Sequence, residues 1–167
     1  MRLQWGDFML DDPRMTNSTF IEGYSSTGSL HYPLYASDVI ISYAHGWSTG
    51  PTSSLSFYVA GIRLLTASGQ TWRIEPMVGD LTEVEAGFVT KLGAFENLIK
   101  TAGGNGGITS MRFITPEGTS GSVSLPGIEG KLVSSLGKNV ALVDGEANGL
   151  DGGNWTLVVN SRKIFRT

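Results

Sequence analysis

The chain has 167 residues, a formal net charge of −3 at pH 7, no cysteine and only 16% charged residues. Its Lys and Arg residues form no cluster, which excludes the concentrated positive field that nucleic acids and anionic membrane surfaces require. Without cysteine there are neither disulfides nor thiolate metal sites, and the composition predicts a neutral partner.

The first residues predict the end of a buried helix. Its apolar positions are Leu3, Trp5, Phe8, Met9 and Leu10. Asp11-Asp12-Pro13 stops it, since proline disfavours a helical conformation at the residue before it. A helix met in mid-course suggests that a domain precedes it. No apolar run is long enough to span a bilayer, and this start lacks the apolar core of a signal peptide, so the compartment stays open.

Residues 11–50 form a long connection rich in Ser, Thr, Gly, Tyr and Asn, and such connections are usually functional or disordered. Its aromatic rings can face the C–H groups of a sugar while their O–H and N–H groups bind its edges. The candidates are Tyr24, Tyr32, Tyr35, Tyr43 and Trp47. Packing of the connection onto a neighbouring element is the alternative for each ring.

A carboxylate and an imidazole in this connection predict acid–base chemistry. Glu22 lies between Phe20-Ile21 and Gly23-Tyr24, and apolar neighbours raise the pKa of a carboxyl group because they disfavour its charged form. That is the setting of a general base. His45 precedes a predicted helix whose N-terminus would aim N–H groups at the site; the alternative is that His45 only braces the helix entry.

The predicted helix covers residues 51–62. Ser48 or Thr49 can cap it, Pro51 suits its first position, and Gly61 suits its C-terminal stop. Its apolar positions repeat at helical spacing and are Leu55, Tyr58, Val59 and Ile62.

From Arg63 onward, short segments rich in β-branched and aromatic residues alternate with Gly-rich turns, which predicts an antiparallel β-sandwich. The expected strands are Thr71–Pro76, Gly87–Val89, Phe95–Lys100, Ile108–Thr115, Gly121–Leu125, Val140–Val143 and Trp155–Asn160. Aromatic residues at strand positions are usually core residues. The expected core residues are Trp72, Phe88, Phe95, Phe113 and Trp155.

The glycine-rich and acidic turns predict neither a cofactor nor a metal. Gly103–Gly107 has no lysine of a phosphate-binding loop and no helix after it. Asp144-Gly-Glu146 and Asp151-Gly-Gly153 resemble pieces of a calcium loop, but their acidic residues do not have the spacing of an EF-hand.

Motifs that keep their order over residues 1–93 carry a family resemblance. They are Met1–Trp5, Met9–Pro13, Ser18–Tyr24, Ala44–Ser53, Phe57–Ile62 and Trp72–Leu81. Together they resemble the C-terminal part of family 78 glycoside hydrolases, the α-L-rhamnosidases, in a fungal-looking form. Gly118–Gly127 and Gly152–Leu157 are similar, more loosely, to the β-domain that ends such enzymes.

The resemblance implies a catalytic barrel of helical hairpins followed by a small β-sandwich, acting with inversion on terminal α-L-rhamnosyl groups. Residues 1–62 would be the barrel end with its active-site loop, and residues 63–167 the sandwich. Glu22 matches the glutamate that activates water, and His45 a histidine that lines the sugar pocket. Inversion also needs a second carboxylic acid. In this family it comes from an earlier barrel segment, so the chain is expected to be inactive alone. The parent family is often secreted.

Two alternatives remain open. The chain is a non-catalytic carbohydrate-binding or interaction module, or a short enzyme that uses Glu22 and His45 as an acid–base pair on a small metabolite. The sugar-binding platforms would be Trp5, Tyr24, Tyr32 and Trp47. The helix at 51–62 and residues 1–10 would leave apolar faces uncovered, which predicts a dimer or docking on another chain.

Overall fold

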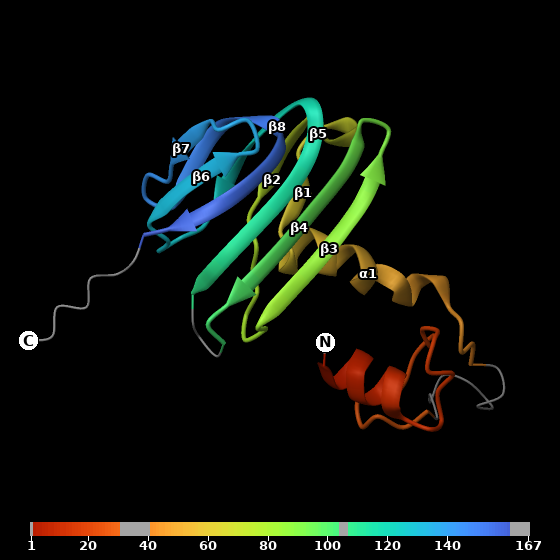
Figure 1. The fold of residues 1–167 in the computed structure, drawn as a ribbon. Coiled ribbons are helices and arrows are strands. Elements are labelled where there is room, and N and C mark those ends of the chain that lie inside the picture. Colours follow the sequence, from red (N-terminus) through yellow and green to blue (C-terminus); the bar gives the residue numbers. More distant parts are fainter. Residues whose placement is uncertain (1, 31–40, 104–106, 161–167) are drawn as a thin grey trace, which may run out of the picture. The chain divides into compact units, whose positions relative to one another are not determined.

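The computed structural model describes residues 2–30, 41–103 and 107–160, and of residues 2–4 only the backbone. The chain divides into two compact units, Met1–Ser53 and Ser54–Thr167 (Figure 1). The barrel-end and sandwich domains expected with a boundary after residue 62 stay a prediction.

The first unit consists of a helix, a loop and the start of a second helical stretch. Its first helix, η1 (Arg2–Asp11), has π-type geometry and ends before Asp12-Pro13, as the sequence predicts. The second stretch begins with η3 (Gly46–Thr49) and α1 (Gly50–Ser54). The residues that follow η1 and precede η3 in the sequence form a small apolar cluster built on Met15, Ile21 and Ile41.

The helical stretch continues into the second unit as η4 (Leu55–Val59), so the helix predicted over residues 51–62 ends three residues early. Gly61 follows it with a φ of +73°, and the predicted glycine stop is confirmed. A Cβ at this position would lie 2.3 Å from the carbonyl carbon of Glu75, so the chain needs glycine here both for its conformation and for space. Ile62, expected in the helix, begins a strand instead.

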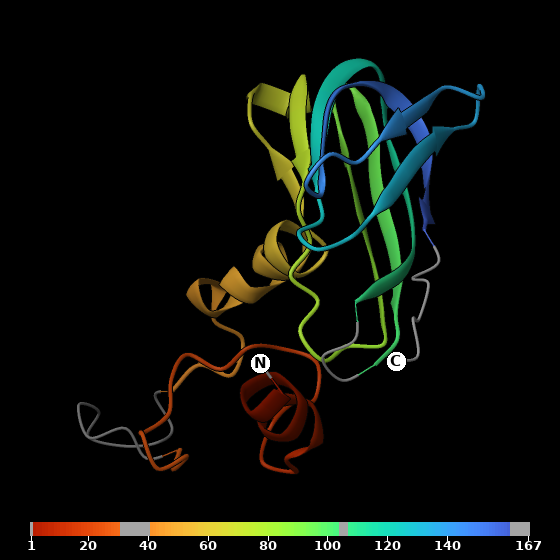
Figure 2. The ribbon, with the colours of Figure 1, turned by 90° about the vertical axis from the view of Figure 1, so that its left-hand side faces the viewer.

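The second unit is mainly β-structure and sandwich-like, as the sequence predicts. Its elements are β1 (Ile62–Leu64), η5 (Ala67–Gly69), β2 (Thr71–Ile74), β3 (Glu83–Thr90), β4 (Gly93–Thr101), β5 (Ile108–Ser124), β6 (Gly130–Ser134), β7 (Asn139–Ala141) and β8 (Glu146–Val159). They form one sheet in the order β1-β2-β5-β8-β6-β7, and β3 and β4 extend it from β5. Figure 2 shows β6 and β7 turning away from β3, β4 and β5.

One strand pair departs from the expected antiparallel arrangement. β2 runs parallel to the C-terminal half of β5, with Thr71 opposite Ser120, so the sheet is mixed. The other half of β5 pairs with β4, and β8 lies along the opposite side of β5. β5 can have three partners because it is long enough for β4 and β2 to follow one another along one side.

The segments predicted as two strands, 108–115 and 121–125, are therefore parts of one strand. Pro116-Glu117-Gly118 has the composition of a hairpin turn, but it lies at a register shift in β5 between Thr115 and Ser120. Proline lacks an N–H for the ladder and Gly118 has a φ of +76°, which are features of a bulge as well as of a turn. The chain bends at this place and does not reverse.

The predicted aromatic core is largely confirmed. Trp72, Phe95, Phe113 and Trp155 are buried, and Phe88 is half-buried and stacks on Phe95 at a centroid distance of 5.7 Å. The aliphatic residues between these rings come from almost every strand. The largest are Ile62, Ile74, Ile99, Met111, Leu125, Leu132 and Leu150.

Candidate functional site

Two segments of the first unit, far apart in sequence, lie side by side. The backbone N–H of Glu22 donates to the carbonyl of Ser42 at 2.7 Å, and the N–H of His45 donates to the carbonyl of Phe20 at 2.8 Å. Thr19 adds a side-chain bond, since its Oγ1 donates to the carbonyl of Tyr43 at 2.6 Å. The resemblance motifs 18–24 and 44–53 thus meet in space.

The residues expected to cap the second helical stretch take part in this pairing. Ser48 donates its hydroxyl to the carbonyl of Ile21 at 2.6 Å, and Thr49 donates to the carbonyl of Gly46 at 2.7 Å. His45 stands at the position before the first turn, and its side chain makes no capping bond there. The predicted caps are therefore wrong, because the helical stretch begins at Gly46 and both Ser48 and Thr49 lie inside it.

The segment pairing brings Glu22 and His45 together. Nδ1 of His45 lies 3.7 Å from Oε2 of Glu22, and the same oxygen accepts a hydrogen bond from the backbone N–H of Ser42 at 3.0 Å. The Glu22 side chain is 11% exposed and that of His45 is 30% exposed. A carboxylate in this position can accept a proton from a small molecule or exchange one with the imidazole. The catalytic roles of both residues stay a prediction.

Trp47 lies against His45, with ring centroids 4.3 Å apart at 45°. Its indole N–H donates to the carbonyl of Glu22 at 3.0 Å, while 71% of the residue is exposed. Trp47 can therefore offer a ring face to a sugar, but its N–H is already used to fix the backbone of Glu22.

A cavity of about 200 Å³ adjoins this arrangement. The predicted site residues among those that line it are Glu22, Trp5 and Tyr24; the others are Met9, Phe20, Ile21, Gly23, Ser48 and Pro51. Sites that enclose drug-sized ligands usually measure about 300–1,000 Å³, so this cavity suits one small ring. His45 and Trp47 lie outside its lining, and Tyr32 falls outside the described residues.

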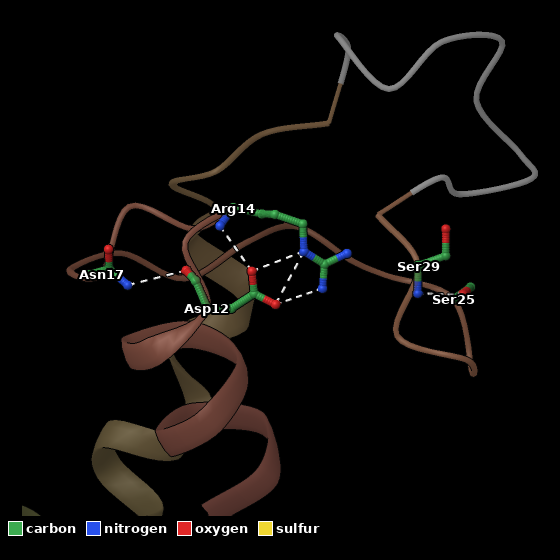
Figure 3. A network of polar contacts seen from close by, with 5 residues as sticks. All are labelled: Asp12, Arg14, Asn17, Ser25 and Ser29. Carbon is green, nitrogen blue, oxygen red and sulfur yellow. Dashed lines mark hydrogen bonds and ion pairs between the residues drawn. The ribbon is translucent and has the colours of Figure 1, made fainter.

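Asp12, near the end of η1, is paired with Arg14 (Figure 3). Its Oδ1 accepts from the N–H and Nε of Arg14, both at 2.9 Å, and its Oδ2 lies 2.6 Å from Nη2. These hydrogen bonds lower the pKa of the Asp12 carboxyl from 3.8 to about 2. Asp12 is therefore ionised at neutral pH and unsuited to donate a proton.

Two further side chains in the same view fix the loop backbone. Asn17 donates from Nδ2 to the backbone carbonyl of Asp12 at 3.3 Å, and Oγ of Ser25 accepts the N–H of Ser29 at 3.0 Å. Nδ2 of Asn17 also donates to the carbonyl of Leu10 at 2.5 Å, which satisfies an acceptor at the end of η1.

The acidic turns of the second unit pair with basic side chains. Oδ2 of Asp151 lies 2.6 Å from Nζ of Lys138, and Oε1 of Glu146 lies 3.1 Å from Nη2 of Arg73. In the described part of the chain, no three His, Asp or Glu side chains gather closely enough to hold a metal ion. No helix among these residues is long and apolar enough to cross a membrane.

The fold is similar to that of α-L-rhamnosidases. One solved structure is the α-L-rhamnosidase from Dictyoglumus thermophilum, with 18% identity and a TM-score of 0.58 over 73% of this chain and 15% of that one. Another is the Streptomyces avermitilis α-L-rhamnosidase complexed with L-rhamnose, with 18% identity and a TM-score of 0.59 over 80% of this chain and 12% of that one. No family model and no curated protein matches the sequence.

The chain spans less than a sixth of either rhamnosidase. The second match covers 80% of 167 residues, about 134, which exceeds the 114 residues from 54 to 167. The matched span therefore includes part of the first unit. At this identity the likeness concerns the fold alone.

Proposed function

We propose that the chain is the C-terminal portion of an α-L-rhamnosidase-like, inverting glycoside hydrolase, and that Glu22 activates the attacking water. The likeness of fold to two α-L-rhamnosidases supports the class. The observation that carries the role of Glu22 is its nearly buried carboxylate, 3.7 Å from His45 and beside a cavity lined by Trp5 and Tyr24. The fungal-looking form of the motifs belongs to the same proposal, although both neighbours are bacterial.

In this mechanism Glu22 removes a proton from water while a second carboxylic acid protonates the leaving oxygen from the other face of the sugar. Glu22 is the only acidic residue among the described residues that line the cavity. Asp12 cannot serve as the second acid because its carboxyl is ionised. The proton donor therefore comes from another part of the enzyme, and the 167-residue chain does not hydrolyse rhamnosides alone.

An assay of the chain with p-nitrophenyl α-L-rhamnoside tests this proposal. We expect no release of nitrophenol. Asp7 is an exposed acid of the same unit, so Asp7→Asn serves as the control. Turnover that disappears in Glu22→Gln but persists in Asp7→Asn would overturn the proposal that the chain is inactive alone. That outcome would favour the short stand-alone enzyme with Glu22 and His45 as its acid–base pair.

The mass of the protein isolated from its source provides the second test. We expect a mass several times the 17.8 kDa of this chain. In that larger protein, Glu22→Gln should lower kcat by about 10²–10⁴-fold, the usual contribution of a general base, while Asp7→Asn should leave it unchanged. A native mass near 17.8 kDa argues against the proposal.

A carbohydrate-binding module is the second candidate function, and the cavity with Trp5 and Tyr24 in its lining supports it. Titration with L-rhamnose can be followed by tryptophan fluorescence. Trp72 and Trp155 are buried in the second unit, so a change would report Trp5 or Trp47. We expect Trp5→Phe to abolish the change; silence across a panel of sugars argues against this function.

The proposal also includes docking on a second chain through the helical stretch. Apolar side chains of η4 remain exposed, among them Leu55, Phe57 and Tyr58. Light scattering at high protein concentration tests this point, because a monomer there contradicts it.

A further inference from the structure

The face of the sheet opposite the core carries a depression of about 490 Å³ that crosses β3, β4 and β5. These strands run side by side at one end of the sheet (Figure 1). Directly paired residues share a face of a sheet, and the register gives two rows across it. One row is Glu85, Leu98 and Arg112, and the next is Gly87, Glu96 and Ile114. The alternate residues, such as Phe95 and Phe113, point into the core.

The charged side chains of the depression are not neutralised by one another. Glu85 and Glu96 have no hydrogen bond or ion pair within the described residues, and Arg112 has only the bond from its Nε to Oδ1 of Asn154 at 3.2 Å. The adjoining row differs, since Glu83 there lies 3.7 Å from Lys100. Two carboxylates, which accept hydrogen bonds, and one guanidinium, which donates them, therefore face solvent inside the depression.

The floor between these charges is small and apolar. Leu98 and Ile114 are half-buried in it, and Gly87 contributes no side chain. A Cβ on Gly87 would lie 2.9 Å from the carbonyl oxygen of Phe95 and 3.1 Å from Cγ of Glu96, so the glycine avoids a backbone collision and leaves the space beside that side chain open. The depression combines an aliphatic floor with walls that accept and donate hydrogen bonds.

We propose that this depression binds a neutral carbohydrate chain, at a site separate from Glu22. The carboxylates of Glu85 and Glu96 accept hydrogen bonds from sugar hydroxyls, and the free edge of the Arg112 guanidinium donates to sugar oxygens. Leu98 and Ile114 contact the C–H face of a pyranose ring. With two carboxylates and one guanidinium, the depression disfavours an anionic ligand and needs no charge on the occupant.

The site does not depend on the proposed hydrolase activity. Its residues all belong to the second unit, whereas the candidate catalytic residues belong to the first. A carbohydrate held here would keep a polymeric substrate attached to the protein while a different part of it is processed.

Amide chemical shifts of the ¹⁵N-labelled 167-residue chain, titrated with neutral pentasaccharides of glucose, mannose, xylose and galactose, test the proposal. Oligogalacturonate and a lysine-rich peptide serve as anionic and cationic probes, and L-rhamnose reports the first unit separately. We expect at least one neutral pentasaccharide to shift the amides of β3, β4 and β5 around Glu85, Glu96 and Arg112.

Single substitutions then identify the binding groups. Glu96→Gln and Arg112→Leu should each weaken binding about tenfold or more, because each removes a charge-assisted hydrogen bond. Glu117→Gln, an exposed acid in the bend of β5, is the matched control and should leave binding unchanged. All three substitutions are at exposed positions, and the far-UV circular dichroism of the variants checks that they fold.

Three results would overturn the proposal: no shift on this face with any neutral pentasaccharide, shifts only with a charged probe, or binding equally strong in all three variants. If L-rhamnose shifts no amide near Glu22 while a pentasaccharide still shifts the amides of β3, β4 and β5, that result counts against the proposed function and leaves this site in place.

Discussion

In the second unit, large side chains are buried between strands that share long hydrogen-bonded ladders, whereas the candidate site of the first unit depends on hydrogen bonds between two loop segments. The described apolar cluster of the first unit is built on Met15, Ile21 and Ile41. That of the second unit includes Trp72, Trp155 and many aliphatic residues. The second unit therefore depends on apolar burial, and the geometry around Glu22 depends on a few polar contacts.

The largest expected effect is the loss of a core tryptophan. Trp72 is fully buried, donates from Nε1 to Thr119 at 2.9 Å and packs edge-on against Phe113. Trp72→Ala should lower the free energy of unfolding by about 3–5 kcal/mol, measured by chemical denaturation. Val89→Ala, at a residue that is 79% exposed, is the control and should change it by less than about 0.5 kcal/mol. Equal effects would show that Trp72 is not a core residue.

The next effect concerns the backbone where the helical stretch ends. Gly61→Ala should destabilise by more than the roughly 1–2 kcal/mol that a left-handed conformation alone costs, because its Cβ would also collide with the backbone of Glu75. Gly79→Ala is a matched control, since Gly79 has a φ of +58° with nothing within 4 Å of an added Cβ. Thermal unfolding of both variants measures the difference, and equal losses would contradict the role of the collision.

A smaller, local effect is expected in the first unit. Trp47→Phe keeps an exposed ring but removes the N–H that donates to the carbonyl of Glu22. It should cost about 1 kcal/mol of local stability, seen as several-fold faster hydrogen exchange at the amides of Glu22 and His45. The amides of β4 and β5 are the internal reference and should be unaffected. Unchanged exchange at Glu22 would mean that this bond does not stabilise the segment pair.

The smallest expected effect is a pH dependence at the end of η1. The pKa of Asp12 is lowered to about 2 by Arg14, so their pairing stabilises the folded state fully above about pH 4. This contribution is lost as the pH falls from about 4 through 2, because the unfolded chain then binds the proton first. Carbon-13 shifts of the Asp12 carboxyl should titrate near pH 2, and near 3.8 in Arg14→Gln. A midpoint near 3.8 in the unchanged protein would contradict the pairing.

The fold was predictable at positions where the residue type alone determines burial or backbone conformation. Aromatic residues in β-rich segments became core residues, and Gly61 ended the helical stretch. Two features were hidden because glycine and proline suit both bulges and turns. Pro116 and Gly118 lie within β5, and the glycine-rich segment 146–154 belongs to β8. At Gly152, an added Cβ would collide with the carbonyl oxygen of Pro116, so this glycine permits two strands to approach closely.

The candidate site was predictable in its side chains but not in its backbone. Glu22 was identified from its apolar neighbours and His45 from its place before a predicted helix, and the structure brings them together. Sequence reasoning missed Ser42, whose N–H binds the carboxylate, and the link from Ser48 to Ile21. A backbone N–H is present at almost every position, so no residue type marks the one that contacts Glu22. Whether the two residues perform catalysis stays a prediction.

The bent strand β5 also affects how quickly this protein can fold. The antiparallel neighbours β3, β4 and β5 follow one another in sequence, so their contacts close short loops. The parallel pair joins Thr71 of β2 to Ser120 of β5, and in the sequence all of β3 and β4 lies between these two strands. Contacts between distant residues form slowly, since a long loop must be ordered before they are made. Until β2 reaches β5, one side of the C-terminal half of β5 remains open, and its unpaired N–H and C=O groups can pair with another chain.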